Sequence, residues 1–152
     1  MVFKEVFLKE LTDEVLDGFG NMLKQKKIAV KLDMQERTPL VSYPAMVKII
    51  IENLVENAIH FAGTESPFIK IKALVSAETA TIEVEDNGQG IMNEYQSRIF
   101  EMYFRANEHS KGNGLGLYIA KKAVEKLSGR IHFVSKHGAG TMFTVELANR
   151  KE

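Results

Sequence analysis

The chain has 152 residues, 45% of them hydrophobic and 26% charged, and its formal net charge is zero. The balanced charge gives no reason to expect a nucleic-acid partner or binding to an anionic membrane. The absence of cysteine excludes disulfides and thiolate metal sites, and no apolar run approaches the roughly 18 residues of a membrane helix. We expect one domain over residues 1–152, without a signal peptide at its charged N-terminus.

Hydrophobic periodicity predicts a helix, a strand and a second helix in the first part of the chain. Residues 5–18 carry apolar side chains at helical spacing, and two glycines after them would end this helix. Residues 28–32 alternate between apolar and polar, as a strand does. The strongest helical pattern covers residues 44–61, with Pro44 in its first turn and Ser42 as a candidate cap.

The middle of the chain predicts a β-hairpin followed by a short helix. Residues 68–73 and 80–84 both read as strands, and Asp86 follows directly after the second of them. Residues 94–101 have the composition of a short helix.

The last part predicts a loop, a helix and a closing hairpin. Residues 105–113 lack apolar periodicity and indicate a mobile loop, whereas residues 114–127 form one apolar helical face. Residues 131–134 and 141–147 predict an antiparallel pair. Helices separated by pairs of strands favour a two-layer α/β sandwich with a mixed sheet.

An acidic residue lies beside two glycines at the predicted strand end. The carboxylate of Asp86 can accept a hydrogen bond from an exocyclic amine such as that of adenine. Gly88 and Gly90 permit positive φ and let a flat ring approach the backbone. An ordinary Asx turn after a strand is the alternative, and the motif is a weak signal when it stands alone.

Glycines also precede the helix predicted at residues 114–127. Residues 112–117 read Gly-Asn-Gly-Leu-Gly-Leu, and free N–H groups at a helix start favour phosphate oxygens. The segment lacks the Lys-Ser/Thr of a Walker loop and the third glycine of a dinucleotide fingerprint. A flexible hinge before a core helix is the alternative.

Two asparagines lie one helical turn apart on the predicted helix over residues 44–61. Asn53 and Asn57 therefore share a face, and an amide inside an apolar helix needs a partner. Mg²⁺ takes oxygen ligands and bridges to nucleotide phosphates, so Asn57 is a candidate metal ligand. The alternative is a pair of amides bonded to backbone groups.

In this order, these motifs resemble the catalytic ATP-binding domain of sensor histidine kinases, in the superfamily that includes gyrase and the mismatch-repair ATPases. The resemblance covers nearly the whole chain. It rests on an asparagine box at 53–58, glycine boxes at 86–91 and 112–117, a phenylalanine box at 99–105, and hairpin segments at 128–131 and 140–143. It implies the Bergerat-type fold, a two-layer α/β sandwich whose mixed, mostly antiparallel sheet packs against about three helices.

The resemblance also implies ATP and Mg²⁺ as ligands and assigns roles to single residues. Asp86 would bind the adenine amino group, with Thr141 nearby through water, and residues 105–113 would form a lid over ATP. Asn53 and Asn57 would be the catalytic pair, with Asn57 as the metal ligand. The implied nucleotide-binding residues are Asn57, His60, Phe61, Asp86, Gly88, Gly90, Ile91, Phe104, Arg105, Lys111, Gly112, Gly114, Leu115, Gly116, Leu117 and Thr141.

Two departures from the family pattern bear on the reaction. Hydrolases of the superfamily place a glutamate one turn before the metal-binding asparagine, and here that position is Asn53. We expect Glu52 and Glu56 to project elsewhere, which favours phosphoryl transfer over hydrolysis. His60 replaces the family's usual Lys or Arg, and it is either a weak, pH-dependent phosphate contact or a surface residue. Lys111 either compensates for it or is a solvated loop lysine.

The phosphoacceptor is missing from the chain. None of its four histidines is followed by the acidic and basic residues that mark the family's acceptor. We therefore expect a fragment, because residue 1 begins where the family's catalytic domain begins. It would be a cytoplasmic monomer that presents the γ-phosphate to a histidine on the dimerisation domain of the same protein, membrane-anchored or not, and would serve a response regulator indirectly. The alternatives are a serine kinase of the anti-sigma-factor type, a partner-binding module without activity, and a hydrolase.

Overall fold

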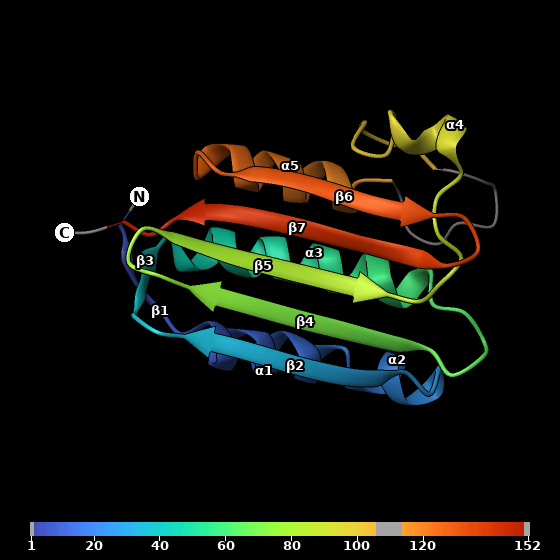
Figure 1. Cartoon of the computed structure of the whole chain (residues 1–152), viewed down its shortest axis with the longest axis horizontal. Coiled ribbons are helices and arrows are strands. Elements are labelled where there is room, and N and C mark those ends of the chain that lie inside the picture. Colours follow the sequence, from blue (N-terminus) through green and yellow to red (C-terminus); the bar gives the residue numbers. More distant parts are fainter. Residues whose placement is uncertain (1, 106–113, 151–152) are drawn as a thin grey trace.

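The computed structural model describes residues 2–105 and 114–150. Its main sheet has five strands in the order β2-β4-β5-β7-β6 (Figure 1). These strands are β2 (Ala29–Glu36), β4 (Phe68–Val75), β5 (Thr79–Asp86), β6 (Arg130–Lys136) and β7 (Gly140–Ala148). Only the pairing of β2 with β4 is parallel, and the three other pairings are antiparallel. The prediction of a mixed, mostly antiparallel sheet is confirmed.

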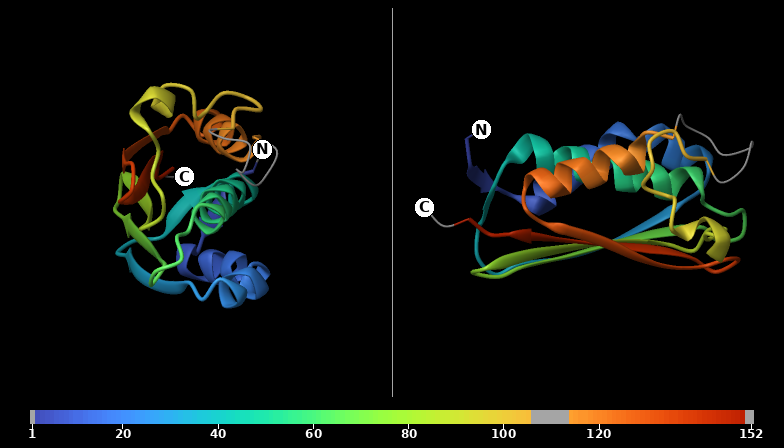
Figure 2. Two further views of the ribbon diagram at one scale, coloured as in Figure 1. Left: turned by 90° about the vertical axis from the view of Figure 1, so that its right-hand side faces the viewer. Right: turned by 90° about the horizontal axis from the view of Figure 1, so that it is seen from above.

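The long helices cover one face of this sheet and leave the other face open, as Figure 2 shows. The helices are α1 (Leu8–Gly18), α2 (Gly20–Gln25), α3 (Pro44–His60), α4 (Asn93–Gln96) and α5 (Gly116–Lys126). Two further strands, β1 (Lys4–Val6) and β3 (Leu40–Ser42), pair with each other beside both chain termini (Figure 1). The result is the expected two-layer α/β sandwich.

Helix α3 lies at the centre of the core. Its apolar residues are spaced three and four positions apart, so they form one apolar face along the helix. Its buried side chains are Val47, Ile50, Ile51, Leu54, Val55, Ala58 and Ile59. The strands facing it bury every second side chain, as a sheet with one covered face requires. This alternation points Ile69, Ile71, Ile82 and Val84 at the helices. The polar residues of α3, among them Asn53 and Asn57, lie on the side of the helix that does not face the core.

The first predicted helix begins later than expected. Residues 4–6 form β1, with Val6 paired to Leu40, so the helix starts at Leu8. The carboxylate of Glu36 accepts a hydrogen bond from the Leu8 backbone N–H at 2.7 Å and so occupies one free donor of the helix start. A three-residue strand has too few alternations to stand out in the sequence.

Other element boundaries also differ from the predictions. Tyr43, without a side-chain cap bond, is the N-cap of α3 in place of Ser42, whereas Pro44 is at the first helical position as predicted. The short helix expected at 94–101 is only α4, and α5 begins at Gly116. The loop predicted at 105–113 lies outside the described residues except for its first position. Within the described ranges, each helix is too short or too polar to cross a bilayer.

Replacement of Leu54 by alanine tests whether α3 is the main source of stability. Leu54 is fully buried, so Leu54→Ala should lower the free energy of unfolding by about 2–5 kcal/mol. Leu74→Ala is the matched control, because Leu74 is 44% exposed on the open face of the sheet, and its cost should stay below about 1 kcal/mol. Urea titration of both variants measures the difference, and equal losses would contradict the assigned core.

Candidate nucleotide-binding site

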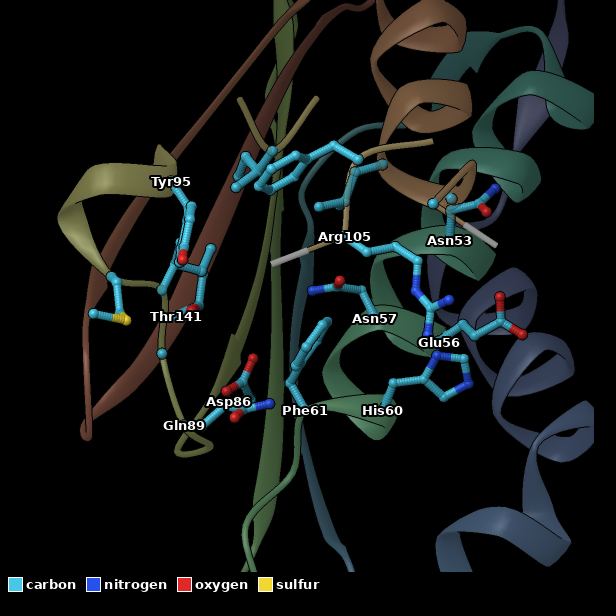
Figure 3. A pocket seen from close by; sticks show the side chains of 18 of the residues that line it. Asn53, Glu56, Asn57, His60, Phe61, Asp86, Gln89, Tyr95, Arg105 and Thr141 are labelled. Atoms are coloured by element: carbon cyan, nitrogen blue, oxygen red, sulfur yellow. The ribbon is translucent and has the colours of Figure 1, made fainter. Parts of the chain in front are cut away.

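One cavity of about 280 Å³ opens between α3, the start of α5, the end of β5, the start of β7, and the segment around α4. Figure 3 shows its two ends. Asp86, Gln89, Tyr95 and Thr141 lie on the side of the sheet, whereas Asn53, Glu56, Asn57 and His60 lie on α3 with Arg105 beside them. Phe61 stands between the two groups. The cavity therefore has an end built on a buried carboxylate and an end built on two amides, two basic side chains and the carboxylate of Glu56.

The carboxylate end depends on Asp86, which is only 5% exposed. Its Oδ1 accepts a hydrogen bond from the backbone N–H of Gly88 at 2.8 Å. Burial raises the pKa of Asp86 from 3.8 to about 6, although hydrogen bonds from the backbone amides of Gly88 and Thr141 partly oppose this rise. The carboxylate is thus ionised at neutral pH in a poorly solvated place, where a ligand N–H would stabilise it.

The loop after β5 packs directly onto the end of α3. A Cβ at Gly88 would overlap the carbonyl oxygen of Phe61, and the same oxygen accepts the Gln89 N–H at 3.2 Å. Gly90 has the expected positive φ, 70°, but Gly88 does not. Gly88 is required for close approach between two backbone segments, and it does not line the cavity.

At the other end, Asn53 is held by its own helix. Its Nδ2 donates to the carbonyl oxygen of Ile49 at 2.8 Å, which leaves Oδ1 directed toward α5. A Cβ built at Gly116 would lie 3.3 Å from that oxygen, so glycine at the start of α5 leaves room for the amide. Asn57 lies one turn further along, on the same cavity wall.

Aromatic side chains form the wall near α4. The rings of Tyr95 and Phe104 are 5.9 Å apart, and the guanidinium of Arg98 lies 4.6 Å from the centre of the Phe104 ring. A cation over an aromatic face is attracted by the ring's quadrupole. This stack holds Phe104 at the cavity wall next to Arg105.

Most of the predicted nucleotide-binding residues line this one cavity. They are Asn53, Asn57, His60, Phe61, Asp86, Gly90, Ile91, Phe104, Arg105, Gly114, Gly116, Leu117 and Thr141. Gly88 and Leu115 are not among the lining residues. Lys111 and Gly112 lie outside the described residues.

Sequence reasoning missed several residues that line the cavity: Glu56, Gln89, Met92, Tyr95, Ile99 and His137. Glu56 was expected to project elsewhere, which is wrong, because its side chain lies at the cavity beside His60 (Figure 3). Its spacing, three residues after Asn53 and four before His60 on the same helix, was the available signal. His137 comes from the turn between β6 and β7, and no local pattern connects that turn to α3.

The donor set fits a cation that is bound together with a nucleotide. Within residues 2–105 and 114–150, no three His, Asp or Glu side chains group into a metal site. Mg²⁺ commonly keeps several waters and takes its other ligands from substrate phosphates. The neutral amide of Asn57 at the cavity wall suits such shared binding.

Comparison with known families agrees with this geometry. The model of the histidine kinase-, DNA gyrase B- and HSP90-like ATPases matches residues 43–151, which include α3, Asp86, α5 and Thr141. The chain belongs to this ATPase family. As an ATPase domain of this family, the chain is expected to use ATP.

Curated relatives of the chain include a sensor protein and a sensor histidine kinase. The heme sensor protein HssS of Staphylococcus saprophyticus is 39% identical over 141 residues, which are 93% of this chain and 30% of that protein. The sensor histidine kinase GlrK of Escherichia coli is 27% identical over 152 residues, 97% of this chain and 32% of that protein. The chain thus spans about a third of the length of these relatives.

A solved structure supports the same assignment. The catalytic domain of histidine kinase ThkA superposes with a TM-score of 0.84 at 28% identity, covering 98% of this chain and 99% of that chain. The protein therefore has the architecture of the ATP-binding catalytic domain of sensor histidine kinases.

The buried charge of Asp86 predicts a pH-dependent gain in stability when it is removed. Because burial raises its pKa, the stability that the neutral carboxyl contributes is present below pH 3.8 and is lost as the pH rises through about 6. At about 1.4 kcal/mol per pKa unit, the ionised form costs about 3 kcal/mol at pH 8. Asp86→Asn in the nucleotide-free domain should therefore gain stability relative to wild type between pH 4 and pH 8 by about that amount.

Urea unfolding of both proteins at several pH values measures this difference. Glu85→Gln is the control, because Glu85 is the neighbouring acid and is less buried. A stability difference between Asp86→Asn and wild type that does not change with pH would show that Asp86 is not a desolvated carboxylate.

Proposed function

We propose that this domain binds Mg·ATP in the cavity and presents the γ-phosphate to a histidine on a separate dimerisation domain. The observation that carries this proposal is the pairing, within one cavity, of the buried Asp86 carboxylate with Asn57 on the opposite wall. Such a cavity suits a ligand with an amino-bearing ring at one end and a metal-bound polyphosphate at the other.

Asp86 and Thr141 would hold the adenine. An ionised acceptor in a desolvated place favours a ring amine, since that N–H replaces the solvation that burial removed. Phe61 lies between the two ends, where its ring would pack against the base or ribose (Figure 3).

The amide and basic end would hold the triphosphate. Asn57 would supply one oxygen ligand to Mg²⁺, which neutralises phosphate charge when it is bound. His60, Arg105 and the first backbone N–H groups of α5 would contact phosphate oxygens from the protein side. Residues 111 and 112 would add to this end. Catalysis would consist mainly of positioning and charge stabilisation.

Phosphoryl transfer is favoured over hydrolysis by Asn53, which lies one helical turn before Asn57 on the same face of α3. Asn53 carries an amide, which cannot act as a general base, and that amide donates to Ile49. Glu56 is the one carboxylate of α3 at the cavity, and it lies at the outer side near His60 (Figure 3). A glutamate in that place would affect phosphate contacts more than the activation of water.

The whole protein would combine this ATP-binding domain with a histidine-bearing dimerisation domain, and its phosphohistidine would serve a response regulator. The sensor protein and the sensor histidine kinase that the chain resembles are about three times its length, which leaves room for such domains. In this proposal residues 1–152 form one domain that is monomeric by itself and works where ATP is available, in the cytoplasm.

Calorimetry with ATP and GTP in excess Mg²⁺ tests the proposed ligand. We expect wild type to bind ATP and Asp86→Asn to bind it about 10- to 100-fold more weakly, because an amide NH₂ can face the adenine amine. GTP binding should not weaken, because the same amide NH₂ can donate to a 6-oxo group. Equal losses for both nucleotides would remove the adenine role from Asp86.

Incubation of wild type and ATP with a dimerisation domain from the parent protein should label its histidine, and release of free phosphate without labelling would favour a hydrolase.

Asn57→Ala tests the metal site. In wild type, ATP should bind more weakly when EDTA removes Mg²⁺, whereas in Asn57→Ala this difference should fall to within about threefold. Asn21→Ala is the matched control, because Asn21 is exposed on α2 away from the cavity, and it should keep the wild-type dependence. A full Mg²⁺ dependence in Asn57→Ala would assign the metal to another ligand.

A further inference from the structure

A hydroxyl network behind the cavity joins three segments of the chain at Ser135. This residue is the third inward-facing position of β6, after Ile131 and Phe133, and it is paired in register with Thr141 of β7. Its Oγ accepts the backbone N–H of Ile91 at 2.8 Å and lies 2.8 Å from Oγ1 of Thr141. It also lies 3.1 Å from the carbonyl oxygen of Gly140. Ser135 itself does not line the cavity, but Ile91 and Thr141 do.

Gln96 fixes the same junction from the other side. Its Nε2 donates to the carbonyl oxygens of Ile91 at 3.0 Å and of Ser135 at 3.3 Å. The loop after β5 is thereby tied to β6 by both the side chain and the backbone of Ser135. A serine held in this way has little freedom to turn its hydroxyl elsewhere.

Counting donors and acceptors determines the direction of these hydrogen bonds. A hydroxyl has one proton to donate and two lone pairs to accept with. One lone pair of Ser135 accepts the Ile91 N–H. If its proton goes to the Gly140 oxygen, the other lone pair accepts the proton of Thr141, and all three contacts are satisfied. If its proton goes to Thr141 instead, the contact with Gly140 is lost, so the first arrangement is favoured.

This direction decides what Thr141 offers to a ligand. With its proton directed at Ser135, the Thr141 hydroxyl turns only lone pairs toward the cavity. The neighbouring Asp86 carboxylate is also an acceptor, and its Oδ1 is already bonded to the Gly88 N–H. The end of the cavity therefore presents acceptors side by side, which suit a 6-amino purine and repel the 6-oxo group of inosine or guanine.

We propose that Ser135 is a positioning residue for nucleotide selectivity: by accepting the Thr141 proton, it keeps that hydroxyl an acceptor and so favours 6-amino over 6-oxo purines. This inference rests on the proposed ATP binding. Without the Ser135 hydroxyl, Thr141 would be able to rotate and donate to a 6-oxo group, so the preference for adenine would decrease although no residue in the cavity had changed.

Calorimetric Kd values for ATP and inosine triphosphate test this role in the whole chain with Mg²⁺. In Ser135→Ala the ratio of the inosine triphosphate Kd to the ATP Kd should fall at least about fivefold from its wild-type value. Ser135→Cys, which fills the same space with a weak hydrogen-bonding group, should lower the ratio in the same direction. A residue needed only for folding would weaken both nucleotides equally and leave the ratio unchanged.

A double-mutant cycle identifies Thr141 as the intermediary. Thr141→Val should lower the ratio by itself, and adding Ser135→Ala to it should have no further effect on the ratio. Ser76→Ala is the matched control, because Ser76 forms a hydroxyl pair with Thr79 at 3.3 Å in the β4–β5 turn, at the other end of the sheet. It should keep the wild-type ratio.

The possible results separate this inference from the proposed function. A wild-type chain that binds neither nucleotide would refute the proposed ATP binding. Normal ATP binding with an unchanged ratio in both Ser135 variants, or with independent effects of Ser135→Ala and Thr141→Val, would overturn the role of Ser135 and leave ATP binding intact.

Discussion

The packing of α3 against the sheet is the constraint on which the rest of the molecule depends. Its buried side chains occupy the middle of the core, and this fixes the rotation of the helix about its own axis. Asn53 and Asn57 consequently face the cavity as a pair. The end of the same helix supplies Phe61, whose carbonyl oxygen receives the loop after β5. One packing interaction therefore sets the distance between the two ends of the nucleotide site.

The opposing constraint is electrostatic. The sheet and loops bury Asp86, so its charged form is poorly solvated. In the absence of nucleotide this desolvation lowers the stability of the domain. A residue that destabilises the fold while lining a cavity is expected at a binding site. The same edge of the sheet carries the Ser135–Thr141 pair, so charge and hydroxyl orientation are set together by the register of β5, β6 and β7. Selectivity in this domain would then depend on strand pairing as well as on the residues that touch a ligand.

Much of the fold was predictable because long elements have strong periods. The pattern of α3 and the two antiparallel hairpins appear in the structure close to their predicted limits. The wrong predictions concern elements that are too short to show a period, or residues that fit two patterns. Strands β1 and β3 have three residues each, and Val6 belongs to β1 although it also fits the apolar face of the predicted helix. In the site, Tyr95 and His137 were missed because they reach the cavity from segments that lack a motif. Glu56 was misjudged because a cavity at a helix edge accepts side chains from more than one face.

The sequence by itself determined the chemistry that this protein has available: a carboxylate at a strand end, two amides one helical turn apart, and glycines before a helix. These features follow from residue type and from spacing along the chain, and neither depends on how the chain is folded. Tertiary structure decided which of them meet in one cavity, how far Asp86 is desolvated, and that the Thr141 hydroxyl faces Ser135. Desolvation and hydrogen-bond direction depend on neighbours contributed by distant parts of the chain, so they arise only when the sheet and α3 are packed together.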